Sequence, residues 1–272
     1  MYPSWVPVSK KEIDQYICYL IESFKFFHKT FSGIKFRNLY IGGGTPSILS
    51  SKQIGKLFSY LFQFFSFEQN GQRTIEINPL SATPAKLYLF EKLGFNRISL
   101  GVQSTNPKVL RTNNRGYQNY NMIKRIISLA KKLSFAEINV DIMANLMNDK
   151  PKYFLKSFSD VAKLQPDNIV VYSLLPTEKY CQYYLKKSKE EYYNNYSRAI
   201  IPILKEIKIA ANKFSYSSPE HLTFSKFSWG FRKKMDTLSR LLKIDMAVNS
   251  RENSHLLALV SVFSLDHISE IF

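Results

Sequence analysis

The chain has 272 residues, of which 45% are hydrophobic, and this composition excludes a disordered protein. Its two cysteines, Cys18 and Cys181, are too few for a disulfide framework or a zinc site, so we expect no metal-ligating residues. The N-terminal residues lack the apolar core of a signal peptide, and no apolar run is long enough to span a bilayer. These features predict a cytoplasmic protein without a membrane span.

The formal net charge of +17 has two interpretations. It indicates an anionic partner, or it reflects a lysine-rich surface that water solvates well. The lysines are scattered along the chain, and no nucleic-acid-binding motif accompanies them. We therefore expect no nucleic-acid partner.

Helix and strand patterns alternate from the N-terminus onward. Ser9 and Glu12 form a capping box that predicts the first helix, and the apolar residues 39–41 then run into glycines, as a buried strand before a turn does. Ser50 and Gln53 form a second capping box. Further strands are predicted at 74–77, 97–102, 137–142 and 168–173, and further helices between Thr83 and Gly94 and at 119–133, 151–164 and 192–214.

This alternation predicts parallel βα units with right-handed crossovers. An open doubly wound sheet and a partial or full barrel both satisfy it, and both place ligands at the carboxyl ends of the strands. We assign residues 1–214 to one core domain. In the tail, 215–272, apolar residues between Phe224 and Leu242 mix with basic ones, which indicates either a basic amphipathic helix or a poorly packed segment.

Polar or glycine-rich residues lie at or near the ends of four predicted strands. The glycines that precede Thr45 indicate a tight turn or a close backbone approach to a ligand, and they do not form a dinucleotide fingerprint. Glu76 lies within a strand, where a carboxylate either faces water at a sheet edge or needs a partner. Gln103 and Asp141 occupy the next two strand ends. Together these groups predict a ligand site at one edge of the sheet.

Several motifs occur in a fixed order: YIGGGTPS, TIEINP, LGVQS, the pair Asn114–Arg115, and INVDIM. In this order and spacing the chain resembles the radical S-adenosylmethionine proteins of the oxygen-independent coproporphyrinogen oxidase group. That group includes the oxidase, a related heme chaperone and some methyltransferases. The resemblance covers residues 39–176 and implies a partial (β/α)6 barrel.

The resemblance also implies roles for the methionyl end of S-adenosylmethionine. Gly43, Gly44 and Thr45 would line its amino group, and Glu76 would support the same end. Arg115 would pair with its carboxylate, which a guanidinium binds in a bidentate manner.

At the nucleoside end, the resemblance implies that Gln103 and Asp141 hold the ribose hydroxyls. Ser173, in the run VVYSLLP, would contact adenine through a strand end. In this family a 4Fe-4S cluster passes one electron to the sulfonium, and the resulting 5′-deoxyadenosyl radical abstracts hydrogen from the substrate. The implied partners are a porphyrinogen-like substrate or heme, and an electron donor.

The chain departs from the family in its cysteines. The family holds its cluster with a CxxxCxxC motif after the first barrel strand, and this motif is absent, because Cys18 falls in the first helix and Cys181 far downstream. We therefore expect a barrel that lacks its first strand and cluster loop, with an open sheet edge there, an N-terminal truncation, and a short α-rich C-terminal extension. In addition, Tyr117 stands in place of a histidine, and 145–147 in place of Gly-Leu-Pro.

Three functions remain open. The first is a radical S-adenosylmethionine oxidoreductase that acts on a porphyrinogen. Because the cluster cysteines are absent, we expect this chain to be inactive, and we assign no catalytic residues. The second is a heme-binding protein related to the heme chaperone. The third is a degenerate remnant without activity. The surviving contacts predict weak S-adenosylmethionine binding in the first two cases.

Overall fold

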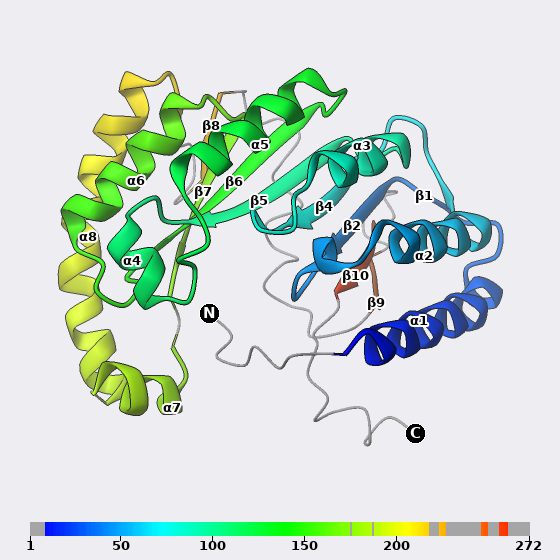
Figure 1. Cartoon of the computed structure of the whole chain (residues 1–272), viewed down its shortest axis with the longest axis horizontal. Coiled ribbons are helices and arrows are strands. Elements are labelled where there is room, and N and C mark those ends of the chain that lie inside the picture. The colour runs from blue at the N-terminus through cyan, green and yellow to red at the C-terminus, as the bar shows by residue number, and fades with distance from the viewer. Residues whose placement is uncertain are drawn as a thin grey trace. The chain divides into compact units, whose positions relative to one another are not determined.

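The computed structural model describes residues 9–174, 176–186, 188–217, 223–226, 246–249 and 256–260 (Figure 1). The chain divides into two compact units. Among the described residues, the first comprises 100–132 and those from 137 to 226, and the second comprises 9–99, 133–136, 246–249 and 256–260. Each unit is an α/β structure with mainly parallel strands.

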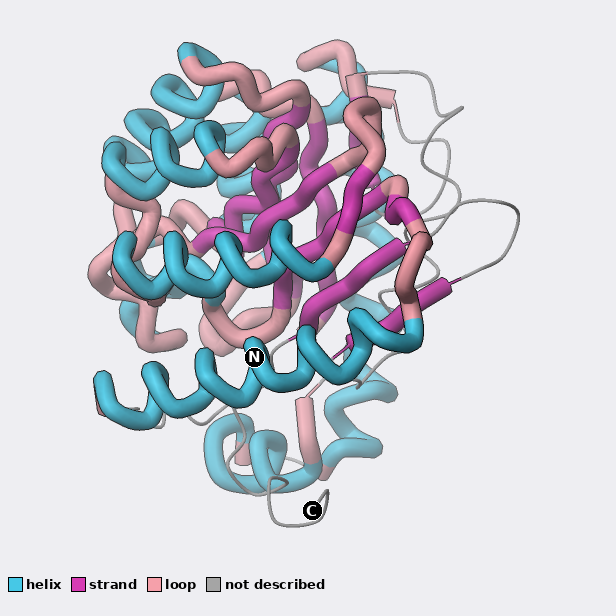
Figure 2. The backbone as a smooth tube through the Cα atoms, turned by 90° about the vertical axis from the view of Figure 1, so that its right-hand side faces the viewer, coloured by secondary structure: helices cyan, strands magenta, loops and turns pink. Residues whose placement is uncertain are grey.

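In the second unit, helices lie against one face of the strands (Figure 2). Its elements are α1 (Lys10–Thr30), β1 (Lys35–Phe36), β2 (Asn38–Gly42), the 3-10 helix η1 (Pro46–Ile48), α2 (Ser51–Phe64), β3 (Ser66–Phe67), β4 (Arg73–Ile77), α3 (Pro84–Lys92), β9 (Met246–Asn249) and β10 (Leu256–Val260). Both predicted capping boxes are present, at the starts of α1 and α2. Thr83 caps α3 as predicted, and Gly94 follows that helix with a φ of 82°.

Aromatic side chains fill much of the core beneath α1 and α2. Phe36 is completely buried and lies edge-on to Phe31 and Phe65, with ring centroids 6.0 and 5.9 Å away. Phe58 packs edge-on against Phe95 at 5.1 Å. Edge-to-face packing of this kind is a favoured geometry for aromatic pairs. Many of the phenylalanine side chains of this unit therefore serve as core residues.

The strands of the second unit follow the order β4-β2-β10-β9. β2 runs parallel to β4, with Leu39 opposite Arg73, and β10 runs parallel to β2 on its other side, with Leu256 opposite Asn38. The predicted open edge is therefore wrong: β10, from the far end of the chain, pairs with β2 there. An unpaired strand edge presents free N–H and C=O groups, which another segment of strand can satisfy.

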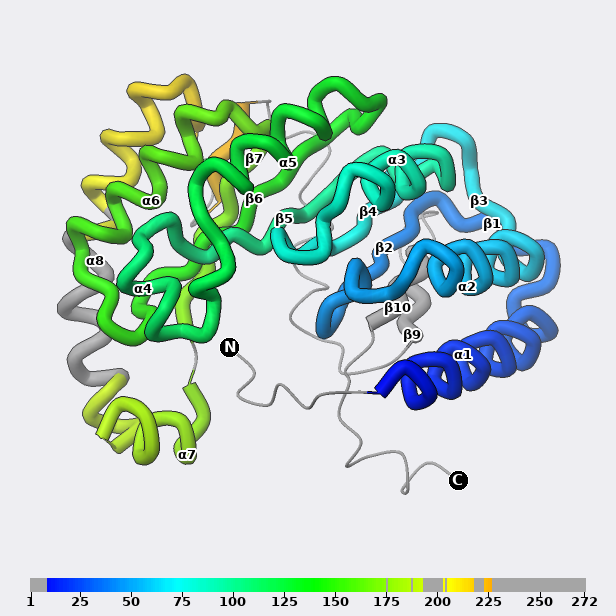
Figure 3. The backbone as a smooth tube through the Cα atoms, viewed as in Figure 1, coloured from blue at the N-terminus to red at the C-terminus, as the bar shows by residue number. Residues whose placement is uncertain are grey.

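In the first unit, the strand order is β8-β7-β6-β5. Its elements are β5 (Arg97–Gln103, of which the first three residues belong to the second unit), α4 (Pro107–Thr112), α5 (Tyr120–Lys132), β6 (Glu137–Ala144), α6 (Pro151–Lys163), β7 (Asn168–Ser173), α7 (Glu178–Tyr180), the π-helix η2 (Cys181–Leu185), α8 (Lys189–Lys213) and β8 (Thr223–Ser225). β6 and β7 are parallel, whereas β8 is antiparallel to β7. Figure 3 shows α6 and α8 running side by side.

The five predicted core strands all form, each within two residues of its predicted ends. The described residues after Lys213 include the strands β8, β9 and β10 rather than helices, so the α-rich extension is not seen there. Most of the predicted basic amphipathic segment, from Phe227 to Leu242, lies outside the described residues. None of the described helices combines the length and apolarity needed to cross a membrane.

Candidate functional site

The glycine run after β2 forms a tight turn. Gly43 and Gly44 have φ values of 78° and 51°, in the left-handed region that glycine adopts without strain. Gly42 is required for a different reason, because a Cβ atom there would lie 2.5 Å from the ring of Tyr40 and 2.8 Å from the carboxylate of Glu76. Thr45 follows at the N-cap position of η1, but its side chain does not cap that helix.

Glu76 is held by two donors from this neighbourhood. Its Oε1 accepts from the hydroxyl of Tyr40 at 2.5 Å, and its Oε2 accepts from the N–H of Gly43 at 3.1 Å. Burial raises the pKa of Glu76, while these two hydrogen bonds and the nearby charge of Arg97 lower it. The carboxyl group therefore fixes the turn, and it does not face water at a sheet edge.

Tyr40 was missed by the sequence interpretation. The register of β2 and β4 pairs Tyr40 with Thr74, so Tyr40, Gly42 and Glu76 lie on one face of the sheet. The period-two alternation of buried and polar positions in both strands was the signal that could have identified it.

Gln103 ends β5 in the first unit with an unusual backbone conformation. Its φ of 65° lies in the left-handed region, which is uncommon for a residue other than glycine. Its side-chain Oε1 is buried and has no hydrogen-bond partner within the described part of the chain. A buried acceptor without a donor is costly, and a ligand hydroxyl would satisfy it.

Arg115 lies against the same strand. Its Nη1 donates to the carbonyl of Gly101 at 2.9 Å and to Oε1 of Gln118 at 3.2 Å. Burial lowers the pKa of Arg115, although a guanidinium remains charged at neutral pH. Across the described residues no carboxylate forms an ion pair with it. A desolvated cation with neutral partners can accept an anionic ligand.

Asp141 and Ser173 sit on neighbouring strands but on opposite faces. Asp141 on β6 pairs with Val170 of β7, and its Oδ1 accepts from Nδ2 of Asn139 at 2.7 Å. Ser173 pairs with Ala144, which puts its side chain on the other face, where its Oγ is buried without a partner among the residues described. At Ser173 itself, only the backbone is thus available on the face of Asp141.

The predicted residues are divided between the two units. Gly43, Gly44, Thr45 and Glu76 belong to the second unit, where the structure brings Gly43 and Glu76 into contact. In the first unit, Arg115 contacts β5 two residues before Gln103. The structure describes no direct contact between the side chains of Gln103, Asp141 and Ser173 within that unit.

The cysteines of this chain do not fit a 4Fe-4S cluster. Cys18 is exposed on α1 of the second unit, and Cys181 is buried in the π-helix of the first unit, where burial raises its pKa. Cluster ligation needs several thiolates together. Among the described residues no three His, Cys, Asp or Glu side chains are grouped so as to hold a metal ion.

Comparison with known proteins connects these groups to one family. The sequence model of the Radical SAM superfamily matches residues 27–160, which include every predicted binding residue except Ser173. The oxygen-independent coproporphyrinogen III oxidase of Escherichia coli (strain K12) is 33% identical over 60% of this chain and 36% of its own length. The heme chaperone HemW of Buchnera aphidicola subsp. Schizaphis graminum is 30% identical over 77% of this chain and 55% of its own length.

A solved structure supports the shared fold. Coproporphyrinogen III oxidase (HemN) from Escherichia coli, described as a radical SAM enzyme, aligns with a TM-score of 0.74 and 24% identity over 92% of this chain and 56% of that one. The chain therefore spans between about a third and just over half of the length of these relatives.

Proposed function

Since this chain belongs to the radical S-adenosylmethionine superfamily, in the group of the coproporphyrinogen oxidase and the heme chaperone, we propose that it binds S-adenosylmethionine, and the residues of each unit are considered separately. The observation that carries this proposal is Arg115, a partly buried guanidinium without a carboxylate partner in the described residues. The α-carboxylate of S-adenosylmethionine would complete the pair, because planar bidentate pairing suits a guanidinium.

Considered by itself, the turn after β2 in the second unit is suited to an ammonium group such as that of S-adenosylmethionine. An ammonium group donates hydrogen bonds, so it requires acceptors, and the backbone carbonyls of the turn at Gly43 and Gly44 and the hydroxyl of Thr45 are such acceptors. Glu76 acts on this turn through the N–H of Gly43. The ammonium charge would also favour the ionised form of Glu76 and so lower its pKa on binding.

The first unit supplies the nucleoside contacts in this proposal. The unsatisfied Oε1 of Gln103 accepts from one ribose hydroxyl, and the carboxylate of Asp141 accepts from the ribose as well. The backbone at Ser173 would contact the adenine edge, since its side chain lies on the opposite face from Asp141. When bound, S-adenosylmethionine would supply the bond between its sulfonium sulfur and the 5′ carbon of the ribose, which is the bond that this family cleaves.

We propose that this chain does not perform radical chemistry, because its cysteines cannot hold the cluster that delivers the electron. Its own residues bind and orient the cofactor. For a protein that also holds the cluster, the proposed activity is oxidative decarboxylation of a porphyrinogen, and the name of the oxidase relatives supports the coproporphyrinogen substrate and the oxidation. A porphyrinogen-like substrate, an electron donor and a cytoplasmic location all belong to this proposal.

A calorimetric titration of the full chain with S-adenosylmethionine tests the binding site. We expect binding by the unaltered chain, a loss of about 10- to 100-fold in affinity for Arg115→Ala, and no change for Arg125→Ala. Arg125 is a matched control, because it is an exposed arginine of α5 in the same unit. Absence of binding, or equal affinity in the Arg115→Ala variant, would overturn the proposal and favour a remnant without function.

A second candidate function is heme binding, as the name of the chaperone relative indicates. The sequence alignment with HemW extends over 77% of this chain and the sequence alignment with the oxidase over 60%, whereas the structural alignment with the oxidase extends over 92%. Titration of the purified chain with hemin, followed through the Soret band, tests this function. A saturable spectral shift would support it, whereas a linear increase at all ratios would exclude it.

A further inference from the structure

Gln103 needs support to keep its conformation. A left-handed backbone at a residue other than glycine persists where the surrounding structure holds it, and such positions gather at binding sites. The Gln103 side chain does not provide that support, because its Oε1 has no partner among the described residues. A backbone hydrogen bond spans Gln103, from the N–H of Ser104 to the carbonyl of Val102 at 2.8 Å, so its neighbours in the chain hold its conformation.

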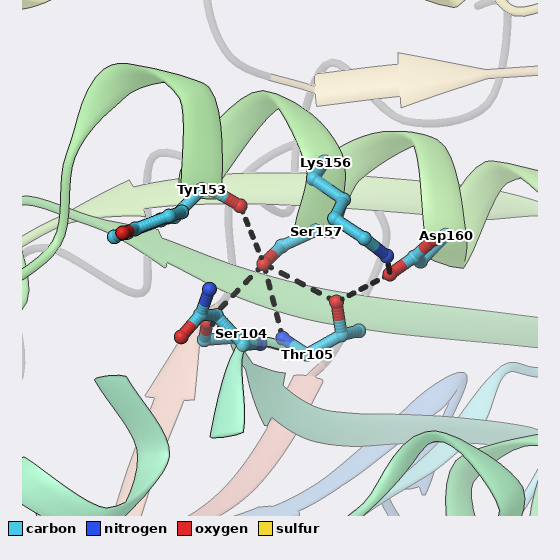
Figure 4. A network of polar contacts seen from close by, with 7 residues as sticks. Ser104, Thr105, Tyr153, Lys156, Ser157 and Asp160 are labelled. Atoms are coloured by element: carbon cyan, nitrogen blue, oxygen red, sulfur yellow. Dashed lines mark hydrogen bonds and ion pairs between the residues drawn. The ribbon is translucent and has the colours of Figure 1, made fainter. Parts of the chain in front are cut away.

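Ser157 of α6 is the centre of the contacts that hold these neighbours (Figure 4). Its side chain is completely buried, and its Oγ accepts from the N–H of Thr105 at 3.0 Å and donates to the carbonyl of Tyr153 at 3.0 Å. The hydroxyl of Ser104 lies 3.2 Å from the same Oγ. One serine of α6 thus binds both residues that follow Gln103.

A carboxylate completes this network from the next turn of α6. The hydroxyl of Thr105 donates to Oδ2 of Asp160 at 2.7 Å, and the same oxygen accepts from Nζ of Lys156 at 2.6 Å. The Asp160 side chain is only 13% exposed, so its contact with Thr105 is shielded from water.

Gln118 holds the turn with a second set of bonds. Its Nε2 donates to the carbonyls of Val102 and Ser104 at 2.7 and 3.0 Å. The residues on either side of Gln103 are therefore fixed, while its own side-chain acceptor is left for a ligand. This division of labour is expected of a binding residue with a supporting shell.

We propose that Ser157, with Thr105 and Asp160, is a positioning residue that holds Gln103 in its left-handed conformation and so orients its amide for the ligand. The ligand part of this inference rests on the proposed S-adenosylmethionine site. The conformational part does not, because it concerns the backbone of Gln103 in the free protein.

The conformational part is tested by NMR on the full chain without ligand. The backbone ¹³C shifts of Gln103 report its left-handed geometry, and Ser157→Ala should move them toward extended values and speed amide exchange at Thr105. Ser159→Ala, on the same helix and without a side-chain hydrogen bond within the described part of the chain, should leave both unchanged. Unchanged Gln103 shifts in Ser157→Ala would overturn the inference.

A second pair of variants keeps the test decisive if Ser157→Ala does not fold. Thr105→Val keeps the shape of the side chain but removes the hydroxyl that binds Asp160, whereas Thr105→Ser retains that hydroxyl. We expect displaced Gln103 shifts in the first variant and recovery of the original shifts in the second. Equal shifts in both variants would contradict the role of the network.

The ligand part is tested by a double-mutant cycle with calorimetry. Ser157→Ala should weaken S-adenosylmethionine binding about fivefold in the unaltered chain, and it should have no further effect in a Gln103→Ala background. A purely structural role would weaken both backgrounds equally and so would overturn the coupling. If the unaltered chain does not bind S-adenosylmethionine while the NMR result holds, the proposed function fails and the positioning of Gln103 stands.

Discussion

The two units treat their polar groups in opposite ways. In the second unit, the carboxyl group of Glu76 is bound by Tyr40 and Gly43. In the first unit, the Oε1 of Gln103 has no hydrogen-bond partner and the guanidinium of Arg115 has no anionic one, within the part that the structure describes. The difference shows that the contacts of Glu76 serve to shape the turn after β2. By contrast, Gln103 and Arg115 retain hydrogen-bonding capacity that a ligand can use.

The largest expected effect on stability comes from adding a side-chain atom beside Tyr40 and Glu76. Gly42→Ala places a Cβ within 2.8 Å of both Tyr40 and Glu76, so we expect a loss of about 3 kcal/mol in the free energy of unfolding. Urea denaturation measures it. Gly55→Ala is the matched control, because no atom lies within 4 Å of its added Cβ in α2, and we expect a gain of about 0.5–1 kcal/mol there. Equal effects of the two substitutions would show that Gly42 is not constrained.

A buried carboxyl group of the first unit, that of Asp149, makes the stability of the protein depend on pH. Burial raises the pKa of Asp149 to about 7, and only the N–H of Lys150 lowers it, while its Oδ1 has no partner among the described residues. Because the folded pKa is above the ordinary value of 3.8, the associated stability is present below that value and is lost as pH rises through about 7.

Asp149→Asn should therefore flatten the fall in unfolding free energy between pH 4 and 7, by an amount on the order of 2 kcal/mol. Denaturation across that pH range measures this fall. Glu190→Gln, at an exposed position in the first turn of α8, serves as the control and should retain the slope of the unaltered chain. An unchanged slope in Asp149→Asn would contradict the assignment.

The smallest effect concerns the donor of Glu76. Tyr40→Phe removes one hydrogen bond to this carboxylate, so the pKa of Glu76 should rise further and the free energy of unfolding at neutral pH should fall by about 1 kcal/mol. Because burial already raises this pKa, stability is lost as pH rises above the ordinary value of 4.5, and the variant should extend that loss to higher pH. Tyr88→Phe, on an exposed tyrosine of α3, should be silent in the same urea titration.

Local patterns were sufficient to predict the main elements of the fold. The capping boxes at Ser9 and Ser50 define helix starts through neighbours only three residues away, and the core strands follow from short apolar runs. The two-residue strands β1 and β3 are too short to show periodicity. The pairing of β10 with β2 depends on residues far apart in the sequence, which no local pattern records.

The candidate site could be predicted from the sequence only in part. The motifs identified the residues that would meet a ligand, but not the groups that hold them. Ser157 resembles an ordinary helical serine until the fold puts it against Thr105, and the tie between Asn113 and Met147 is equally invisible in sequence. Supporting contacts of this kind arise from tertiary packing, so only the structure identifies them.

The partnership of β2 with β10 has a consequence for how the chain is made. Residues 38–42 leave the ribosome early, whereas residues 256–260 follow after most of the chain has been synthesised. Until then, β10 is not there to pair with β2, and closing so long a loop is slow. During translation, the N–H and C=O groups on the side of β2 that β10 later covers are therefore open to pairing. A chaperone or a neighbouring chain can bind there before β10 has been synthesised.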